Sequence, residues 1–281
     1  FGDFSRNEYP LGVGVMSDII ATSAGKNPWW ITEMQGGPVT ASGNKILCPS
    51  SQETKQAVWT GIFSGTKGVM FWTLNARKAV REAGEWALLD FAGGKSDRLE
   101  GISELASVID REKDFFDGAV PAKSEVYILF SKESFWVLNE NVGFGKTNAV
   151  SRSDGALAAP MIAAYKSLSA SGLSPVIQDI ASFDFDPSKT VVLPNVMALQ
   201  DKDVERLCKF VEDGGTMVST GMTWYYDETM GCRFMENSPV YKCLGGRLKE
   251  YSIGEKAWTL DFDGLDLVSE HWSGTVIPTD A

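Results

Sequence analysis

The chain has 281 residues, of which 43% are hydrophobic, so it is long enough for one large domain or for two domains with sizeable cores. This composition excludes an intrinsically disordered chain. The 26 lysines and arginines face 37 acidic residues, and the resulting net charge of −11 argues against nucleic acid or an anionic membrane surface as the partner.

The first half of the chain alternates helical and extended patterns. Apolar residues at helical spacing predict helices over 11–24, 52–64 and 96–116. Compact runs of aromatic and β-branched residues predict buried strands over 29–34 and 68–74. The pair Ser50-Ser51 is the expected N-cap of the second helix. This alternation predicts parallel strands joined by crossover helices.

A short Gly/Pro segment at 117–122 separates this half from a second alternating pattern, and we place a domain boundary there, between 118 and 119. The segment 132–153 is rich in Asn, Gly and Ser and is predicted to be a loop, and beyond Trp224 we expect mixed, β-rich structure. Strands are predicted over 125–130, 175–180, 190–194 and 216–220, and helices over 156–169 and 201–212. The order predicts a doubly wound, flavodoxin-like sheet of about five strands.

Cysteine and histidine are scarce. The four cysteines (Cys48, Cys208, Cys232 and Cys243) lack the CxxC spacing of zinc sites and are too scattered for a disulfide framework. Cys208 lies on the apolar side of a helical pattern and is predicted to be in the core, while Cys232 and Cys243 either pair or remain free thiols. His271 is the only histidine, so a catalytic triad or an imidazole metal site would rest on it alone. We expect an ordinary surface or partly buried histidine, and carboxylates are the default catalytic groups. No stretch of 18 uncharged apolar residues predicts a transmembrane helix.

Glu33 is the candidate catalytic residue. It ends a run of apolar residues that we predict to be a buried strand, where a charge is costly unless it is paired or functional. The carboxyl ends of strands are also where parallel α/β barrels place catalytic groups. The alternative is a structural ion pair between Glu33 and an arginine such as Arg77 or Arg81.

Five of the nine tryptophans fall between residues 29 and 86. Indole rings near a carboxylate suit a sugar site, because the faces of pyranose rings stack on them. The alternative interpretation, which we favour for Trp29, Trp30 and Trp59, is that these side chains are simply core. Trp72 and Trp86, at a strand end and in the loop that follows, fit either interpretation.

Three segments of the first half carry a resemblance to a known family. They are Trp30 to Gly37 (WITEMQGG), Gly68 to Thr73 (GVMFWT) and Glu82 to Leu88 (EAGEWAL). In this order and spacing they resemble the end of the catalytic barrel of glycoside hydrolase family 42, the β-galactosidases. In that family the glutamate that matches Glu33 is the nucleophile at the end of the seventh strand. The segments 191–194 and 210–218 resemble the family's middle domain, a glutamine-amidotransferase-like fold associated with trimer formation.

This resemblance implies that residues 1–118 are the C-terminal part of a (β/α)8 TIM barrel, about strands six to eight. Residues 119–281 are then a glutamine-amidotransferase-like oligomerisation domain. A whole barrel needs about 250 residues, so the N-terminal barrel portion is missing from this chain. The family carries its general acid/base on an Asn-Glu pair after the fourth strand, which we expect upstream. The pairs Asn7-Glu8 and Asn139-Glu140 only imitate it, and Tyr9-Pro10 is expected to end the sixth strand near the site.

The family also implies residues that bind the sugar hydroxyls and shape the pocket. They are Tyr9, Gln35, Trp72, Asn75, Glu82, Glu85 and Trp86. This sequence departs from the family at two places: the usual Glu-x-x-His motif reads Glu82-Ala83-Gly84-Glu85, and residues 36–49 lack the tryptophan expected after the nucleophile. Both departures bear on which sugar is recognised.

The implied function is a retaining β-galactosidase-like hydrolase that acts on a galactoside, forms a homotrimer, and uses no cofactor or metal. Glu33 would attack the anomeric carbon while the upstream glutamate protonates the leaving group. An alternative is a non-catalytic oligomerisation or carbohydrate-binding module. A third possibility, an independent flavodoxin-like or amidotransferase-like enzyme, would require a flavin or a cysteine in a nucleophile elbow, and no such cysteine follows a predicted strand.

Overall fold

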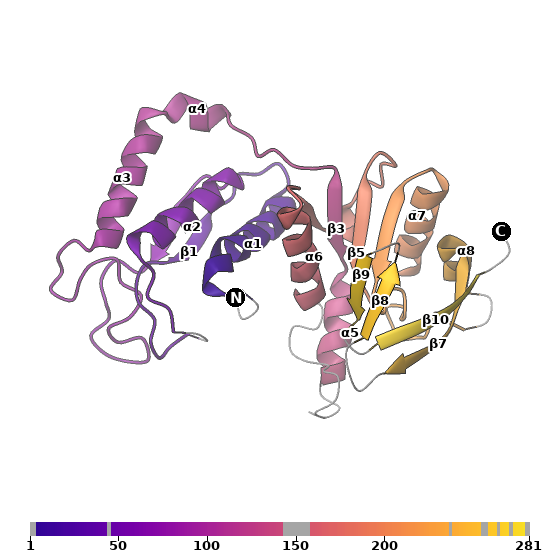
Figure 1. Cartoon of the computed structure of the whole chain (residues 1–281). Helices are drawn as coiled ribbons and strands as arrows, with labels where there is room; N and C mark the ends of the chain where they lie inside the picture. The colour runs from indigo at the N-terminus through magenta and orange to yellow at the C-terminus, as the bar shows by residue number, and fades with distance from the viewer. Residues whose placement is uncertain are drawn as a thin grey trace. The chain divides into compact units, whose positions relative to one another are not determined.

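The computed structural model describes residues 4–43, 46–142, 158–235, 238–253, 258–262, 265–269 and 272–278. The chain is an α/β protein with parallel sheets, as the alternating pattern predicted (Figure 1). It divides into two compact units, Phe1–Lys123 (unit 1) and Ser124–Ala281 (unit 2). Within the described ranges, no helix is long and apolar enough to cross a membrane.

Unit 1 is built on two parallel strands, β1 (Ile31–Gln35) and β2 (Val69–Trp72). Ile31 lies opposite Val69 and Gln35 opposite Trp72. Its helices are α1 (Tyr9–Ala24, preceded by a 3-10 turn at Arg6–Glu8), α2 (Ser51–Phe63), α3 (Asp97–Arg111) and α4 (Lys113–Gly118). The buried side chains of Val13, Met34 and Ala57 join α1, β1 and α2 in a small apolar cluster.

Serine side chains begin two of these helices. Ser50 accepts a hydrogen bond from the backbone N–H of Glu53 at 3.2 Å, and the Glu53 carboxylate reaches back to the Ser50 N–H at 2.7 Å. This capping box satisfies two backbone donors that would otherwise lack partners at the start of α2. Ser96 caps α3 with a single bond, its hydroxyl accepting from the N–H of Leu99 at 3.3 Å. The predicted N-cap of the second helix is thus confirmed at Ser50.

Three local predictions for unit 1 are wrong. Tyr9-Pro10 does not end a strand but begins α1, where a proline suits the first turn because its missing N–H and fixed φ cost nothing there. The helix predicted over 96–116 is two helices, because Glu112 leaves the helical conformation with φ −102° and ψ 29°. Trp30 is not core: 53% of its surface is exposed, and its ring covers Gly68, where a side chain would collide with it.

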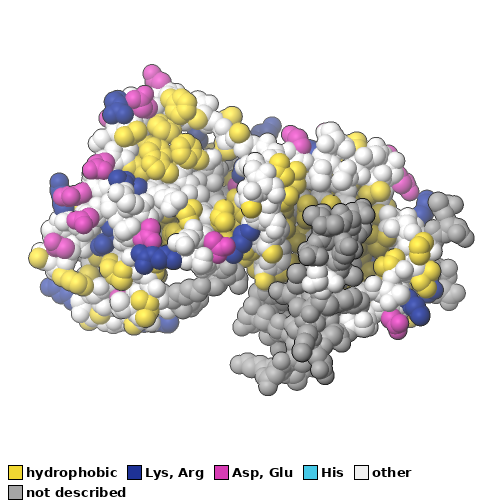
Figure 2. Space-filling model, in the orientation of Figure 1, with side chains coloured by type: hydrophobic (Ala, Val, Ile, Leu, Met, Phe, Trp, Pro, Cys, Tyr) yellow, Lys and Arg dark blue, Asp and Glu magenta, His cyan; other side chains and the backbone are white. Residues whose placement is uncertain are grey.

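Aromatic side chains gather where α2 and α4 meet. The Trp59 ring stacks on Phe63 at 5.5 Å and on Phe116 at 5.8 Å between ring centroids, and Phe115 packs edge-on against Phe116. Phe63 and Phe115 remain 64% and 66% exposed. Figure 2 shows hydrophobic side chains gathered over this part of unit 1. Trp59 is therefore a half-buried member of a surface aromatic cluster.

Unit 2 is built on a four-stranded parallel sheet in the order β4-β3-β5-β6. Figure 1 labels its two central strands, β3 and β5. Ile128 of β3 lies opposite Ile177 of β4 on one side and Val192 of β5 on the other. The strands are β3 (Val126–Phe130), β4 (Val176–Asp179), β5 (Thr190–Pro194) and β6 (Thr216–Thr220), and the helices are α5 (Lys132–Val142), α6 (Ala158–Ala170), α7 (Asp201–Glu212) and α8 (Pro239–Leu244). A 3-10 turn at Ile180–Ser182 follows β4.

Two antiparallel strand pairs complete the C-terminal part. They are β7 (Gly246–Ile253) with β10 (Trp272–Pro278), and β8 (Trp258–Phe262) with β9 (Leu265–Ser269). The β-rich structure expected beyond Trp224 is confirmed. The main sheet has four strands among the described residues, where about five were predicted.

The predicted loop over 132–153 is wrong in its first part, because Lys132–Val142 form helix α5. The Ser131 hydroxyl accepts the N–H of Ser134 at 3.1 Å at the start of this helix, and Val137 on it is 4% exposed. The Asn, Gly and Ser that suggested a loop lie mostly in 143–153, outside the described residues, as does His271. Cys208 packs against the core of unit 2 as predicted, and Cys232 and Cys243 are free thiols rather than a pair.

Candidate active site

A cavity of about 700 Å³ opens in unit 1. One wall comes from α1 and the turn before it, and includes Tyr9, Val13 and Met16. The opposite end comes from β1, the loop after it and the segment after β2. Six of the predicted site residues line this cavity: Tyr9, Glu33, Gln35, Trp72, Glu82 and Trp86. Residues more than seventy positions apart in the chain thus meet at one site.

Glu33 presents a solvent-exposed carboxylate on the cavity wall, from the middle of β1. The predicted alternative was an ion pair with an arginine. Arg77 instead pairs with Glu82, Nη1 to Oε2 at 3.2 Å, and among the described residues no cation lies within ion-pair distance of Glu33. With respect to the described residues, the Glu33 carboxylate is therefore available to a ligand.

Trp72, Glu82 and Arg77 form a second group at the same end of the cavity. Trp72 ends β2, and its peptide bond to Thr73 is cis. Its indole Nε1 donates to Glu82 Oε2 at 3.4 Å, and the Arg77 guanidinium lies 4.8 Å above its ring. These contacts hold an indole face and a carboxylate side by side, an arrangement that suits a sugar ring and its hydroxyls.

Gln35 and Tyr9 line the cavity in more constrained positions. The Gln35 side-chain amide donates to the Gly37 carbonyl at 2.8 Å and to the Leu47 carbonyl at 3.3 Å, so its N–H groups are used within the loop. Tyr9 packs against the small apolar cluster of unit 1, and burial raises the pKa of its phenol. Tyr9 therefore keeps its proton across the neutral pH range.

The structure does not bring Asn75 or Glu85 to the cavity wall. Asn75 is exposed in the segment after β2. Glu85 is 4% exposed, and its Oε1 accepts hydrogen bonds from the Thr40 N–H (2.8 Å), the Thr40 hydroxyl (2.5 Å) and the Ala41 N–H (2.6 Å). Its Oε2 accepts from the N–H and the hydroxyl of Ser42. These donors, the Ser42 hydroxyl above all, hold the pKa of Glu85 at about 2.

Backbone hydrogen bonds join the loop after β1 to the segment after β2. Trp86 N–H donates to the Pro38 carbonyl at 2.8 Å, and Thr73 N–H donates to the Trp86 carbonyl at 2.7 Å. Gly36 and Gly37 lie so close to residues 86 and 87 that a Cβ on Gly36 would come within 2.7 Å of the Trp86 carbonyl oxygen. Only glycine allows this approach of backbone to backbone.

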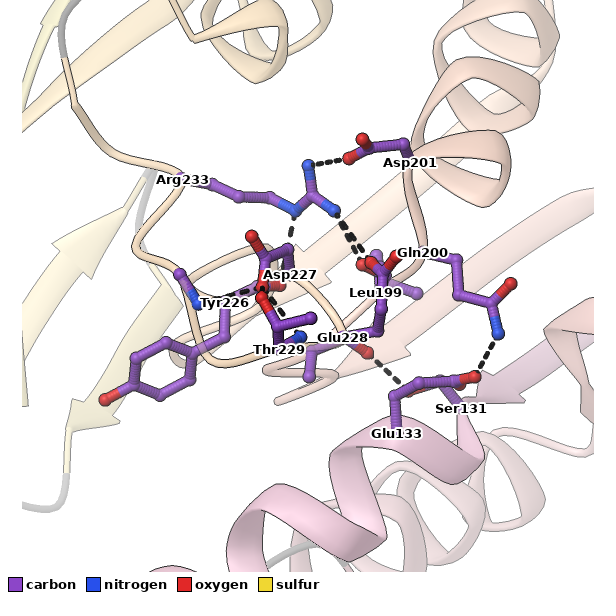
Figure 3. Close-up of polar contacts among 12 residues, drawn as sticks. Ser131, Glu133, Leu199, Gln200, Asp201, Tyr226, Asp227, Glu228, Thr229 and Arg233 are labelled. Atoms are coloured by element: carbon purple, nitrogen blue, oxygen red, sulfur yellow. Dashed lines mark hydrogen bonds and ion pairs between the residues drawn. The ribbon is translucent and has the colours of Figure 1, made fainter.

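A polar cluster of another kind lies in unit 2, centred on Arg233 (Figure 3). The Arg233 side chain is 8% exposed and points toward the start of α7, where its Nη1 lies 2.6 Å from Asp201 Oδ1. Its Nη2 donates to the Leu199 carbonyl at 2.7 Å and its Nε to the Tyr226 carbonyl at 3.2 Å. Nearby, the Gln200 amide donates to the buried carboxylate of Glu133. The groups of this cluster satisfy one another, so it ties loops together rather than forming a binding site.

No set of three or more His, Cys, Asp or Glu side chains that could hold a metal ion occurs within the described ranges. The sequence analysis did not identify the Thr40–Ser42 segment, which donates hydrogen bonds to the Glu85 carboxylate. Its signal was a Thr-Ala-Ser run in a Gly-rich loop, and such residues often offer hydroxyl and N–H donors to a carboxylate.

Comparison with known proteins gives a consistent result. Residues 124–281 match the family described as the β-galactosidase trimerisation domain. Among curated proteins no sequence matches the chain. Among solved structures, a catalytic mutant of Gan42B, a GH42 β-galactosidase from G. stearothermophilus, is similar with a TM-score of 0.81 at 14% identity over 98% of this chain and 39% of its own.

Two further structures have the same fold. A β-galactosidase from the Antarctic haloarchaeon Halorubrum lacusprofundi gives a TM-score of 0.78 at 20% identity, over 96% of this chain and 38% of its own. A β-galactosidase from Bacillus circulans sp. alkalophilus gives 0.77 at 16% identity, over 98% of this chain and 40% of its own. The chain therefore spans about two fifths of the length of the solved structures that it resembles, and at these identities the likeness shows the fold.

Proposed function

The chain belongs to the family of the β-galactosidase trimerisation domain of glycoside hydrolases, and from this premise we propose that it is part of a retaining β-galactosidase-like hydrolase. Its substrate class is terminal β-galactosides. The observation that carries the proposal is the exposed Glu33 carboxylate on a cavity wall that also holds the indoles of Trp72 and Trp86.

Glu33 acts as the nucleophile of a double displacement. Its carboxylate attacks the anomeric carbon and forms a glycosyl-enzyme, and the leaving oxygen takes a proton from a second carboxylic acid about 5–5.5 Å away. That acid then removes a proton from water, which releases the sugar and regenerates Glu33. The general acid/base belongs to the barrel portion that precedes unit 1.

In this proposal neither Glu8 nor Glu140 supplies that acid. Glu8 accepts hydrogen bonds from the N–H and hydroxyl of Ser5 at 2.9 and 2.8 Å in the turn before α1, and it does not line the cavity. Glu140 lies in unit 2, on α5. Unit 1 is then the end of a TIM barrel, with β1 and β2 as its last two strands, which fits their parallel pairing.

The sugar is bound by the groups at the polar end of the cavity. Trp72 and Trp86 offer ring faces, and Glu82 and Gln35 offer polar atoms to hydroxyls. Asn75 and Glu85 take no direct part in this binding, because neither lines the cavity. Tyr9 closes the α1 side.

The test is Glu33→Gln in the polypeptide expressed from its complete reading frame. We expect hydrolysis of a nitrophenyl β-galactoside to fall by at least about 10³-fold, since the amide cannot form the glycosyl-enzyme, while the melting temperature stays unchanged. Glu104→Gln, at an exposed position of α3, is the matched control and should keep full activity. More than about a tenth of the activity remaining in Glu33→Gln would overturn the assignment.

Unit 2 supports a second proposal. Its four parallel strands in the order β4-β3-β5-β6 suit a flavodoxin-like, amidotransferase-like domain, and the family match covers this unit. We propose that it assembles the protein into a homotrimer. Sedimentation equilibrium of the chain should give three times the 30.6 kDa mass of one chain, and a monomer at micromolar concentration would contradict the proposal.

The rival function is a non-catalytic oligomerisation module. What favours it is that the family match covers residues 124–281 and not the cavity of unit 1. A stable trimer whose complete polypeptide hydrolyses no β-galactoside, and binds none, would establish this alternative. Hydrolysis that depends on Glu33 would exclude it.

A further inference from the structure

Glu85 stands where the resemblance predicts a hydroxyl-binding group, yet its carboxylate faces the loop after β1. Its five hydrogen-bond donors come from Thr40, Ala41 and Ser42, three consecutive residues that lie more than forty positions earlier. A carboxylate enclosed in this way has no oxygen left for a sugar. It holds a loop of the cavity wall in one conformation.

The loop in turn holds Trp86. The Ser42 hydroxyl donates a hydrogen bond to Glu85 Oε2, so the lone pairs of the hydroxyl oxygen point away from the carboxylate. One of them accepts the indole N–H of Trp86 at 2.8 Å. A chain of hydrogen bonds therefore runs from the Glu85 carboxylate through Ser42 to the indole of the next residue.

Trp86 is held in an unusual conformation. Its φ is 67°, a left-handed value that is strained for a bulky side chain. Such a conformation persists only where several contacts determine it, and here the backbone bonds to Pro38 and Thr73 do so together with the indole bond to Ser42. The result is an indole fixed on the wall of the cavity that Glu33 also lines.

We infer that Glu85 is a positioning residue that sets the Trp86 indole against the sugar through Ser42, and so determines substrate affinity without touching the substrate. This inference rests on the proposed glycosidase function. It also explains how the site has an aromatic wall although residues 36–49 contain no tryptophan: the loop that lacks an indole binds the indole of residue 86.

The experiment is a double-mutant cycle in the polypeptide expressed from its complete reading frame, with KM and kcat measured on a nitrophenyl β-galactoside. Glu85→Gln and Ser42→Ala should each raise KM about five- to tenfold and change kcat less than about threefold, because they loosen binding and not chemistry. In a Trp86→Phe background, Glu85→Gln should change KM less than about twofold.

Asp90→Asn is the matched control. Asp90 also accepts backbone N–H groups within a loop, from Ala92 at 2.9 Å and Gly94 at 2.7 Å, but it does not line the cavity. It should leave KM unchanged. Equal effects of Glu85→Gln with and without Trp86 would show that Glu85 acts independently of this indole, and would overturn the inference.

Acrylamide quenching provides a readout that does not depend on activity. The fluorescence of Trp86, obtained as the difference between each protein and its Trp86→Phe counterpart, should be quenched more strongly in Glu85→Gln and Ser42→Ala than in the wild type. If this increase is seen but no β-galactoside is hydrolysed, the positioning role stands and the proposed function fails. If hydrolysis is seen and the Trp86 signal does not change, the proposed function stands and the positioning role fails.

Discussion

The interior of each unit of this chain is stabilised by a different kind of interaction. Among the described residues, every one of the largest completely buried side chains lies in unit 2, and twelve buried residues there form one apolar cluster around Phe183, Leu207 and Phe210. In the described part of unit 1, one cluster has three buried members, Val13, Met34 and Ala57. Around the cavity, unit 1 relies on hydrogen bonds instead, from Glu85 to the Thr40–Ser42 loop and between backbone segments.

This difference shows how a structural unit and a site-bearing unit divide their roles. A packed apolar core stabilises without regard to direction, whereas hydrogen bonds fix loops in defined orientations. The candidate site is in unit 1, whose described part has none of the largest completely buried side chains, and an exposed polar group such as Glu33 costs little there. Unit 2 has the larger core and no such demand on its interior.

The largest effect that we expect comes from the core of unit 2. Phe210 is 1% exposed, and its ring lies 6.3 Å from that of Phe183 between centroids. Phe210→Ala should lower the free energy of unfolding by about 3–5 kcal/mol, since it removes buried apolar surface and leaves a cavity. Differential scanning calorimetry should show the shift in one of two transitions. Met34→Ala, in the cluster of unit 1, should shift the other transition and cost about 2 kcal/mol. Equal losses in both would break the comparison.

Arg233→Ala should have the next largest effect, a loss of about 2–3 kcal/mol, because it leaves the carbonyls of Leu199 and Tyr226 without the guanidinium. Arg233→Lys should recover part of it. Urea unfolding followed by circular dichroism measures both variants. Arg111→Ala is the control: its guanidinium is 67% exposed and pairs with its neighbour Glu112, so it should cost less than about 0.5 kcal/mol. A harmless Arg233→Ala would show that hydrogen bonds matter little in unit 2.

Ser50→Ala should lower stability by about 1 kcal/mol, since the capping box at the start of α2 is lost. The change should appear in the calorimetric transition of unit 1 alone. Ser103→Ala, in the exposed interior of α3, is the control and should change stability by less than about 0.5 kcal/mol. An unchanged transition in Ser50→Ala would mean that packing, not capping, holds α2.

The smallest effect that we expect is a change in acid stability. Hydrogen bonds from Ser42 and Thr40 lower the pKa of Glu85 from 4.5 to about 2, and bonds from Arg6 do the same to Glu53, so both carboxylates favour the folded state when ionised. Their stabilisation is present above about pH 4.5 and is lost as the pH falls toward 2. The unit 1 transition should therefore move to lower temperature between pH 5 and pH 2.5, and move less in Glu85→Gln. An identical slope in the variant would contradict this.

The elements with strong periodicity were predictable. All six strands from β1 to β6 were expected within two residues of their bounds, because runs of apolar, aromatic and β-branched residues are local signals. The burial predicted for β1 and β2 is wrong, since Glu33 is exposed and Met70 is 48% exposed. Helix α5 was not predicted, because the Asn, Gly and Ser residues of 143–153 suggested one loop over the whole of 132–153. The first part of that range has apolar residues that are buried in unit 2, such as Val137. Local composition does not reveal which neighbour will bury a helix face.

Of the candidate site, Glu33 does line the cavity, but the prediction that it ends a buried strand is wrong: it is the middle residue of β1, and Thr32 and Glu33 are exposed. The hydrogen bonds from Thr40, Ala41 and Ser42 to the Glu85 carboxylate could not be predicted from the sequence. They join two loops that meet only when β1 and β2 are paired. Trp30 illustrates the same limit: an aromatic run predicts burial, yet the exposed ring lies over Gly68. Pairings between loops are set by the tertiary fold and leave no periodic signal.

The contact of Gly36 and Gly37 with residues 86 and 87 has a consequence for how the loops around the cavity can vary in directed evolution. Saturation libraries at these two positions should yield almost only the parental glycine, because any side chain there would push apart the backbone that carries Trp86. The two loops around the cavity are therefore coupled in sequence space. Variation of the cavity wall is better sought at Ile46, which lines the cavity, is 77% exposed, and is not among the nearest neighbours of the two glycines.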